Sequence, residues 1–148
     1  MKSLIAGLVL LLSLALPSFG QRNPDSLNHD TTFRRALLKS IRYPAAAQRE
    51  QRVASVYVGF TVDREGHITS IQILNRDGVA GSFRQEAKRF LKQLPSQKPA
   101  YAGAYVLPVV FTLEGVGKTI KPRDEVNPPI SALNHRLVLN RIYVTGYL

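Results

Sequence analysis

Apolar and polar residues alternate along three stretches of the chain, and this period of two predicts three β-strands. The stretches are 55–62, 67–75 and 101–113. Two other stretches place apolar residues three and four positions apart, which predicts amphipathic helices. These stretches are 30–43 and 82–94. A short helix is expected over 44–51, because Pro44 suits a first helical position and alanines follow it.

The two long helices have recognisable ends. Asp30 or Thr31 can cap the first helix, whose apolar residues are Phe33, Leu37, Leu38 and Ile41. Ser82 is the expected cap of the second helix, with Gln85 as its capping-box partner. Pro95 ends that helix, because proline cannot continue it. Its apolar stripe predicts a buried face, made of Phe83, Ala87, Phe90, Leu91 and Leu94.

The first two strands are expected to form a hairpin. Asp63 to Gly66 is a tight turn, with glycine at a position where a positive φ is needed. The apolar residues of the second strand change phase between Ile68 and Ile71, which predicts a β-bulge near Thr69 and Ser70. A broken turn that ends at Gly78 leads to the second long helix.

The third strand carries the most informative residue, Pro108. Its apolar side includes Leu107 and Phe111. Proline has no N–H for a ladder and is tolerated at sheet edges, strand starts or bulges. We therefore expect an edge strand that offers its backbone to an extended segment of a partner.

The first residues read as a secretory signal peptide over 1–20, followed by a flexible lead-in over 21–29. The apolar run from Leu4 to Leu16 is short for a bilayer span of about 20 residues. We expect export to the periplasm, with an uncleaved inner-membrane anchor as the alternative. Association with a membrane is expected only if the leader is retained.

The chain has no cysteine and a formal net charge of +10. Disulfides are thereby excluded. The charge favours acidic proteins or a membrane surface as partners, although a solvated basic surface is the simplest interpretation. Nucleic acid is not an expected partner of an exported protein.

No motif for catalysis or metal binding is complete. The run Gly117-Lys118-Thr119 lacks the glycine that a phosphate loop needs five positions earlier, where Thr112 stands. The three histidines are far apart in the sequence and lack metal-ligand spacing. We expect no enzyme, no metal and no cofactor.

The order of these motifs resembles the C-terminal domain of TonB-type energy transducers. The resemblance covers roughly residues 33–114 and rests on five motifs. They are Tyr43-Pro44-Ala-Ala-Ala47, the hairpin Val56 to Ile68 with its turn at Gly66, the turn ending at Gly78, the helix stop Leu94-Pro95, and Leu107-Pro-Val-Val-Phe-Thr-Leu113. It implies an α+β fold of order ααββαβ, with a small antiparallel sheet of three strands and helices on one face.

The resemblance also implies a function and a site. In this family the domain captures a short extended segment of an outer-membrane receptor by adding it to the sheet edge. The expected partners are a TonB-dependent receptor or another envelope protein, and the expected contacts are Tyr105, Val106, Pro108, Val110 and Thr112. Six residues are expected to be structural: Tyr43, Pro44, Gly66, Gly78, Leu107 and Phe111.

The role of the last third of the chain is open at this point. We expect the domain to span 30–114 and a linker and tail to span 115–148. Apolar and polar residues alternate weakly between 135 and 148. This pattern is compatible with an extra strand, a swapped arm or a tail that orders on contact. The alternative function is a structural or self-associating module, whose edge is occupied by segment 136–147 or by a second copy as a homodimer.

Overall fold

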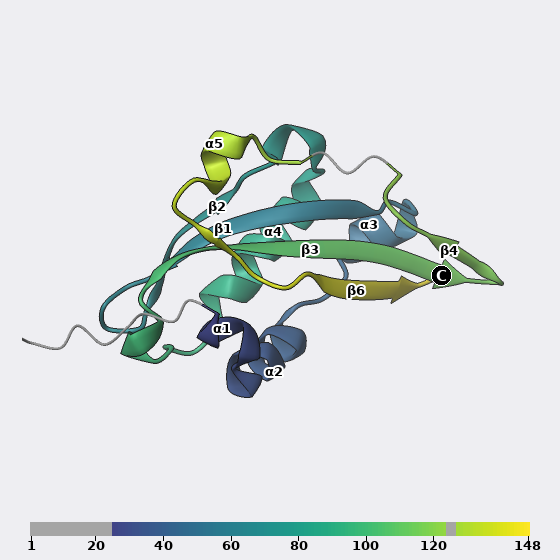
Figure 1. Ribbon diagram of the computed structural model, residues 1–148. Helices are drawn as coiled ribbons and strands as arrows, with labels where there is room; N and C mark the ends of the chain where they lie inside the picture. The colour runs from purple at the N-terminus through teal and green to yellow at the C-terminus, as the bar shows by residue number, and fades with distance from the viewer. Residues whose placement is uncertain (1–24, 124–126) are drawn as a thin grey trace, which may run out of the picture.

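The structure is a computed structural model that describes residues 25–123 and 127–148. The expected signal peptide and the first part of the lead-in lie outside the described residues. Helices flank one sheet, which the strands form (Figure 1). The helices are α1 (Ser26–His29), α2 (Thr31–Ser40), α3 (Ala45–Arg49), α4 (Gly81–Lys92) and α5 (Ile130–Leu133), with 3-10 turns η1 (Arg76–Gly78) and η2 (Pro99–Tyr101). The strands are β1 (Ala54–Val62), β2 (Ile68–Ile73), β3 (Gly103–Gly115), β4 (Lys118–Ile120), β5 (Leu137–Val138) and β6 (Ile142–Tyr147).

The sheet has β1 between β2 and β3, and both of its neighbours are antiparallel to it. β4 is antiparallel to the end of β3, whereas β5 and β6 run parallel to β3. Leu113 and Glu114 pair with β4 as well as with β6, so β4 and β6 lie on opposite sides of β3. The α+β class is confirmed, but the sheet in the described residues has six strands and is mixed, where three antiparallel strands were expected.

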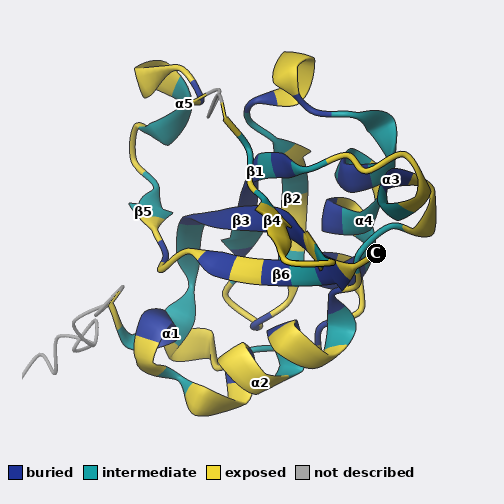
Figure 2. Cartoon of the chain, turned by 90° about the vertical axis from the view of Figure 1, so that its right-hand side faces the viewer, coloured by how far each residue is buried: buried dark blue, intermediate teal, exposed yellow. Residues whose placement is uncertain are grey.

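The core lies between the sheet and helices α2 and α4. Alternate residues of β1 and β3 point into it, together with Phe33 and Leu37 of α2 and the apolar stripe of α4. Phe60 stacks on Tyr105 with ring centroids 5.5 Å apart, and Phe83 lies 4.8 Å from Phe111. The exposure colours show β3 as a mostly buried strand (Figure 2). Leu38 is an exception to the predicted apolar face of α2, since it is 54% exposed.

The segment around α5 crosses the opposite face of the sheet. The hydroxyl of Tyr57 lies 2.9 Å from Asn127 Oδ1. A Cβ placed on Gly59 would lie 2.0 Å from the guanidinium of Arg136. Tyr57 and Gly59 alternate with the core residues of β1, so this segment covers the side of the sheet that α2 and α4 leave open.

One predicted helix cap is confirmed and the other is wrong. The side chain of Asp30 accepts the Phe33 N–H at 2.8 Å, as expected of the cap of α2. Helix α4 begins at Gly81, with Ala80 in the capping position and no side-chain cap. Ser82 therefore lies inside the first helical turn, where its hydroxyl no longer has the geometry of a cap.

The predicted hairpin is confirmed. Gly66 has a φ of +91°, and Asp63 Oδ1 accepts the N–H groups of Glu65 and His67 at 3.0 and 2.8 Å. The pairing of β1 with β2 shifts between Gly59 and Thr61. Ser70 opposite this shift has a φ of +52°, which is the bulge that the change of phase predicted.

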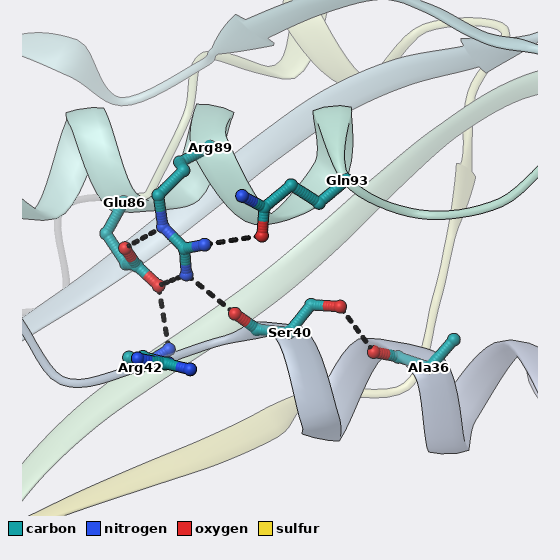
Figure 3. A network of polar contacts seen from close by, with 6 residues as sticks. All are labelled: Ala36, Ser40, Arg42, Glu86, Arg89 and Gln93. Carbon is teal, nitrogen blue, oxygen red and sulfur yellow. Dashed lines mark hydrogen bonds and ion pairs between the residues drawn. The ribbon is translucent and has the colours of Figure 1, made fainter.

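A polar network holds α4 against the end of α2 (Figure 3). Glu86 accepts hydrogen bonds from Arg89 Nε at 2.7 Å and from the Arg42 N–H at 2.7 Å. Arg89 also donates to the Ser40 carbonyl at 2.6 Å. These contacts fix the two helices that form one wall of the core.

Candidate partner-binding site

The candidate site is the side of β3 that faces away from β1. Tyr57 of β1 directs its backbone groups toward β2, because its carbonyl accepts the Leu74 N–H and its N–H donates to Asn75 Oδ1. Pro108 pairs with Tyr57 in the antiparallel register. Backbone groups alternate along such a ladder, so Pro108 and the other even-numbered residues of β3 direct theirs away from β1.

This side of β3 is occupied by the chain itself, so the prediction of an edge strand is wrong. β5 pairs with Tyr105 and Val106, and β6 pairs with residues 109–114. The Val106 carbonyl accepts the Leu139 N–H at 2.8 Å, and the Glu114 carbonyl accepts the Leu148 N–H at 2.9 Å. The linker expected after residue 115 contains β4, and the tail supplies the parallel strands. Of the alternatives open for the tail, the structure shows an extra strand beside β3.

Pro108 lies where this ladder is interrupted. β5 ends at Val138 and β6 begins at Ile142, and Pro108 faces the residues between them. The Asn140 N–H in that gap donates to Asn28 Oδ1 of α1 at 2.7 Å. Proline offers no donor at this point, so the neighbouring chain leaves the ladder and bonds to α1. The proline marks a break in pairing, not a sheet edge.

The five expected contact residues divide between the two faces of the sheet. Tyr105 is 2% exposed, lies in the core, and donates its hydroxyl to the Tyr101 carbonyl at 2.5 Å. Val106, Pro108, Val110 and Thr112 share the opposite face and are buried. Thr112 Oγ1 lies 3.3 Å from Thr145 Oγ1 of β6. Their role in partner binding stays a prediction.

Residues expected to be structural lie in the core or at turns. The Tyr43 ring packs edge-on against Phe83 and Phe111, with centroid distances of 5.8 and 5.7 Å. Its hydroxyl donates to the Arg52 carbonyl, and burial raises the pKa of Tyr43 to about 12. Leu107 and Phe111 are buried, whereas Gly78 closes the exposed turn η1. Pro44 precedes α3 in its capping position.

The side chains of β6 alternate between the core and solvent. Ile142 and Val144 are buried, whereas Tyr143 and Tyr147 are 62% and 66% exposed. The Tyr147 carbonyl points away from β3 and accepts a hydrogen bond from the Gln48 side chain. The alternation after residue 135 is the sequence signal for this strand, but it does not specify the partner strand or the parallel direction.

No group of three metal-binding side chains occurs within residues 25–123 and 127–148. In the same part of the chain, no helix has both the length and the apolar character needed to cross a bilayer. The site itself is a row of backbone donors and acceptors on β3 that pairs with β5 and β6 in this structure.

A family model described as the C-terminal domain of the Gram-negative bacterial TonB protein matches residues 39–113, which is 75 of the 148 residues. The matched span runs from the end of α2 to β3 and stops before β4, β5 and β6. No curated protein and no solved structure matches this chain.

Proposed function

Because this chain belongs to the family of Gram-negative bacterial TonB protein C-terminal domains, we propose that it binds an extended segment of an outer-membrane protein by strand addition beside β3. The family is a periplasmic, non-enzymatic domain of envelope transport that interacts with outer-membrane proteins. The ligand is a segment of the receptor, the site is β3, and the segment adds to the sheet as a strand.

The observation that carries the proposal is the pairing of β3 with β6. A six-residue extended segment already lies in parallel register along residues 109–114. The same backbone groups can pair with a visiting segment of similar length if β6 moves away. Pro108 supports such an exchange, because the ladder beside β3 is already interrupted between β5 and β6.

A reversible disulfide between β3 and β6 tests this exchange. Thr112→Cys with Thr145→Cys places two thiols where the hydroxyls are 3.3 Å apart, in a chain without other cysteines. We expect peptides copied from the plug segments of outer-membrane receptors to bind the reduced protein. Oxidation should weaken binding at least about tenfold, because a locked β6 cannot vacate the row. Amide shifts along 105–114 report the site of binding.

Reduction of the same sample is the control for folding, and either single cysteine variant controls for the substitutions. Equal peptide binding by the locked and reduced forms would contradict exchange beside β3. Absence of binding in both forms would favour the second candidate function.

The second candidate is a structural envelope module whose β6 is permanent. It is favoured by the burial of Leu139, Ile142 and Val144, and by the bond from Asn140 to Asn28. Hydrogen exchange separates the two functions. If the Val144 amide exchanges only with global unfolding, as the Val58 amide of β1 is expected to do, β6 does not vacate the site. Light scattering would show whether the module self-associates as a homodimer.

A further inference from the structure

A basic groove lies on the other side of the molecule, between β2 and α4. It has a volume of about 380 Å³. Its cationic side chains are Arg76 of η1 and Arg84 and Lys88 of α4, and its remaining lining is Gln72, Ile73, Gly81 and Gln85. Within residues 25–123 and 127–148, no carboxylate lines it. The groove therefore gathers three positive charges on the outside of β2.

Among the described residues none of these three cations forms an ion pair, and Asp77 is the acidic neighbour of Arg76 in η1. The acidic residue of α4, Glu86, is engaged on the side of the helix that faces α2, with Arg89 and the Arg42 N–H (Figure 3). The first turn of α4 has no acidic residue and no side-chain cap. The Arg84 guanidinium lies 3.7 Å from the position of a Cβ on Gly81, beside this positive end of the helix.

The groove also borders a strand edge. Within the described residues β2 pairs with β1 and with no strand on its other side. Gln72 pairs with Gly59, and the Leu74 N–H donates to the Tyr57 carbonyl, so residues 72 and 74 direct their backbone groups toward β1. Ile73, which lies between them, consequently directs its backbone groups outward, and Ile71 lies next to it at the bulge. A backbone edge and a cluster of cations thus face the same volume.

We propose that this groove binds an extended acidic segment of another protein, which adds to β2 as a strand. Its backbone pairs with Ile71 and Ile73, and carboxylates on one of its faces meet Arg76, Arg84 and Lys88. An acidic peptide fits better than a lone anion, because the groove offers main-chain partners and amide side chains as well as charge. This site goes beyond the site beside β3 and does not require β6 to move.

Titration of the full chain with a synthetic peptide tests the proposal. The probe alternates glutamate with threonine, and a second peptide carries glutamine at each glutamate. We expect the acidic peptide to shift the amides of Ile71 and Ile73, and the glutamine peptide to bind about tenfold more weakly. Arg84→Glu with Lys88→Glu should weaken binding of the acidic peptide by at least as much.

The matched control is Arg35→Glu with Lys39→Glu, which makes the same change of charge at the same spacing on the exposed face of α2. Equal losses in the two variants would overturn the proposal, because binding would then depend on net charge alone. Binding of inorganic phosphate or phosphatidylglycerol vesicles in place of the peptide would also overturn it. The disulfide between residues 112 and 145 should leave this binding unchanged, which distinguishes the two sites.

Discussion

Asp30 connects three parts of the structure through one carboxylate. It caps α2 through the Phe33 N–H, accepts the Tyr101 hydroxyl at 2.7 Å and lies 3.2 Å from Lys98 Nζ. These bonds, first the one from Phe33, hold the pKa of Asp30 at about 2. The folded state therefore favours the charged form, and this stability is complete above the carboxyl's unfolded pKa and is lost as the pH falls through about 2.

Asp30→Asn keeps an oxygen for the Phe33 N–H but removes the charge. We expect a loss of about 1 kcal/mol in the free energy of unfolding near pH 7, because the bonds to Lys98 and Tyr101 weaken. The difference from the wild type should shrink between about pH 4 and pH 2, where the wild-type carboxyl also becomes neutral. Urea unfolding at both ends of this range measures it. A difference independent of pH would show that the charge contributes nothing.

Tyr43 combines a ring in the core with a hydroxyl at its boundary. Tyr43→Phe removes the hydrogen bond to the Arg52 carbonyl and should cost about 1 kcal/mol. Tyr43→Ala also removes the edge-on contacts with Phe83 and Phe111, and should cost about 3–4 kcal/mol. Chemical denaturation compares the two. Equal losses would mean that the hydroxyl, not the ring, holds this residue.

The role of a single residue is predictable from the sequence when it depends on residues a few positions away. Asp30 directly precedes the apolar spacing of its helix, and Gly66 follows a turn-forming aspartate, so both roles were predictable. The prediction for Ser82 was wrong because α4 begins at Gly81, two residues before the first apolar residue of its stripe, Phe83. This shift places the serine inside the first turn of the helix.

Among the elements, β6 was the least predictable in its placement. Helices α2, α3 and α4 and the first three strands follow from spacings within a few residues of one another. Helix α1 instead lies in the expected flexible lead-in, and α5 lies in the expected linker and tail. The parallel pairing of β6 with β3 joins residues more than 30 positions apart, and alternation alone does not choose between free and paired edges. Pro108 was interpreted as the mark of an edge because a missing donor excludes a continuous ladder. A missing donor is equally compatible with an interrupted ladder, which is the arrangement beside β3.

At Gly146 the backbone of β6 lies against the side chains of Leu113 and Tyr43. A Cβ there would lie 2.8 Å from Leu113 Cδ2 and from Tyr43 Cγ. We expect Gly146→Val to lift the end of β6, at a cost of about 1–3 kcal/mol. Hydrogen exchange should show a faster Leu148 amide, while the β1 amides change less.

Tyr143→Val is the matched control, because it places the same β-branched residue at an exposed position of β6. Faster exchange in both variants would mean that the strand responds to composition and not to the close approach at Gly146.

The whole molecule carries a formal net charge of +10. Self-repulsion of the folded state is strongest at low ionic strength, because the Debye length is then longest. We expect the thermal midpoint to rise by a few degrees between about 0.01 and 0.15 M salt. Calorimetry measures the midpoint. A fall would mean that ion pairs such as Lys98 with Asp30 outweigh the repulsion.

The missing donor of Pro108 has a consequence for any polypeptide that replaces β6. Such a polypeptide finds the Pro108 carbonyl as an acceptor but no donor at this position, so one of its own carbonyls has no partner on β3. A consensus recovered by selecting random peptides against this protein should therefore be bipartite. Two short conserved blocks would flank a single variable residue.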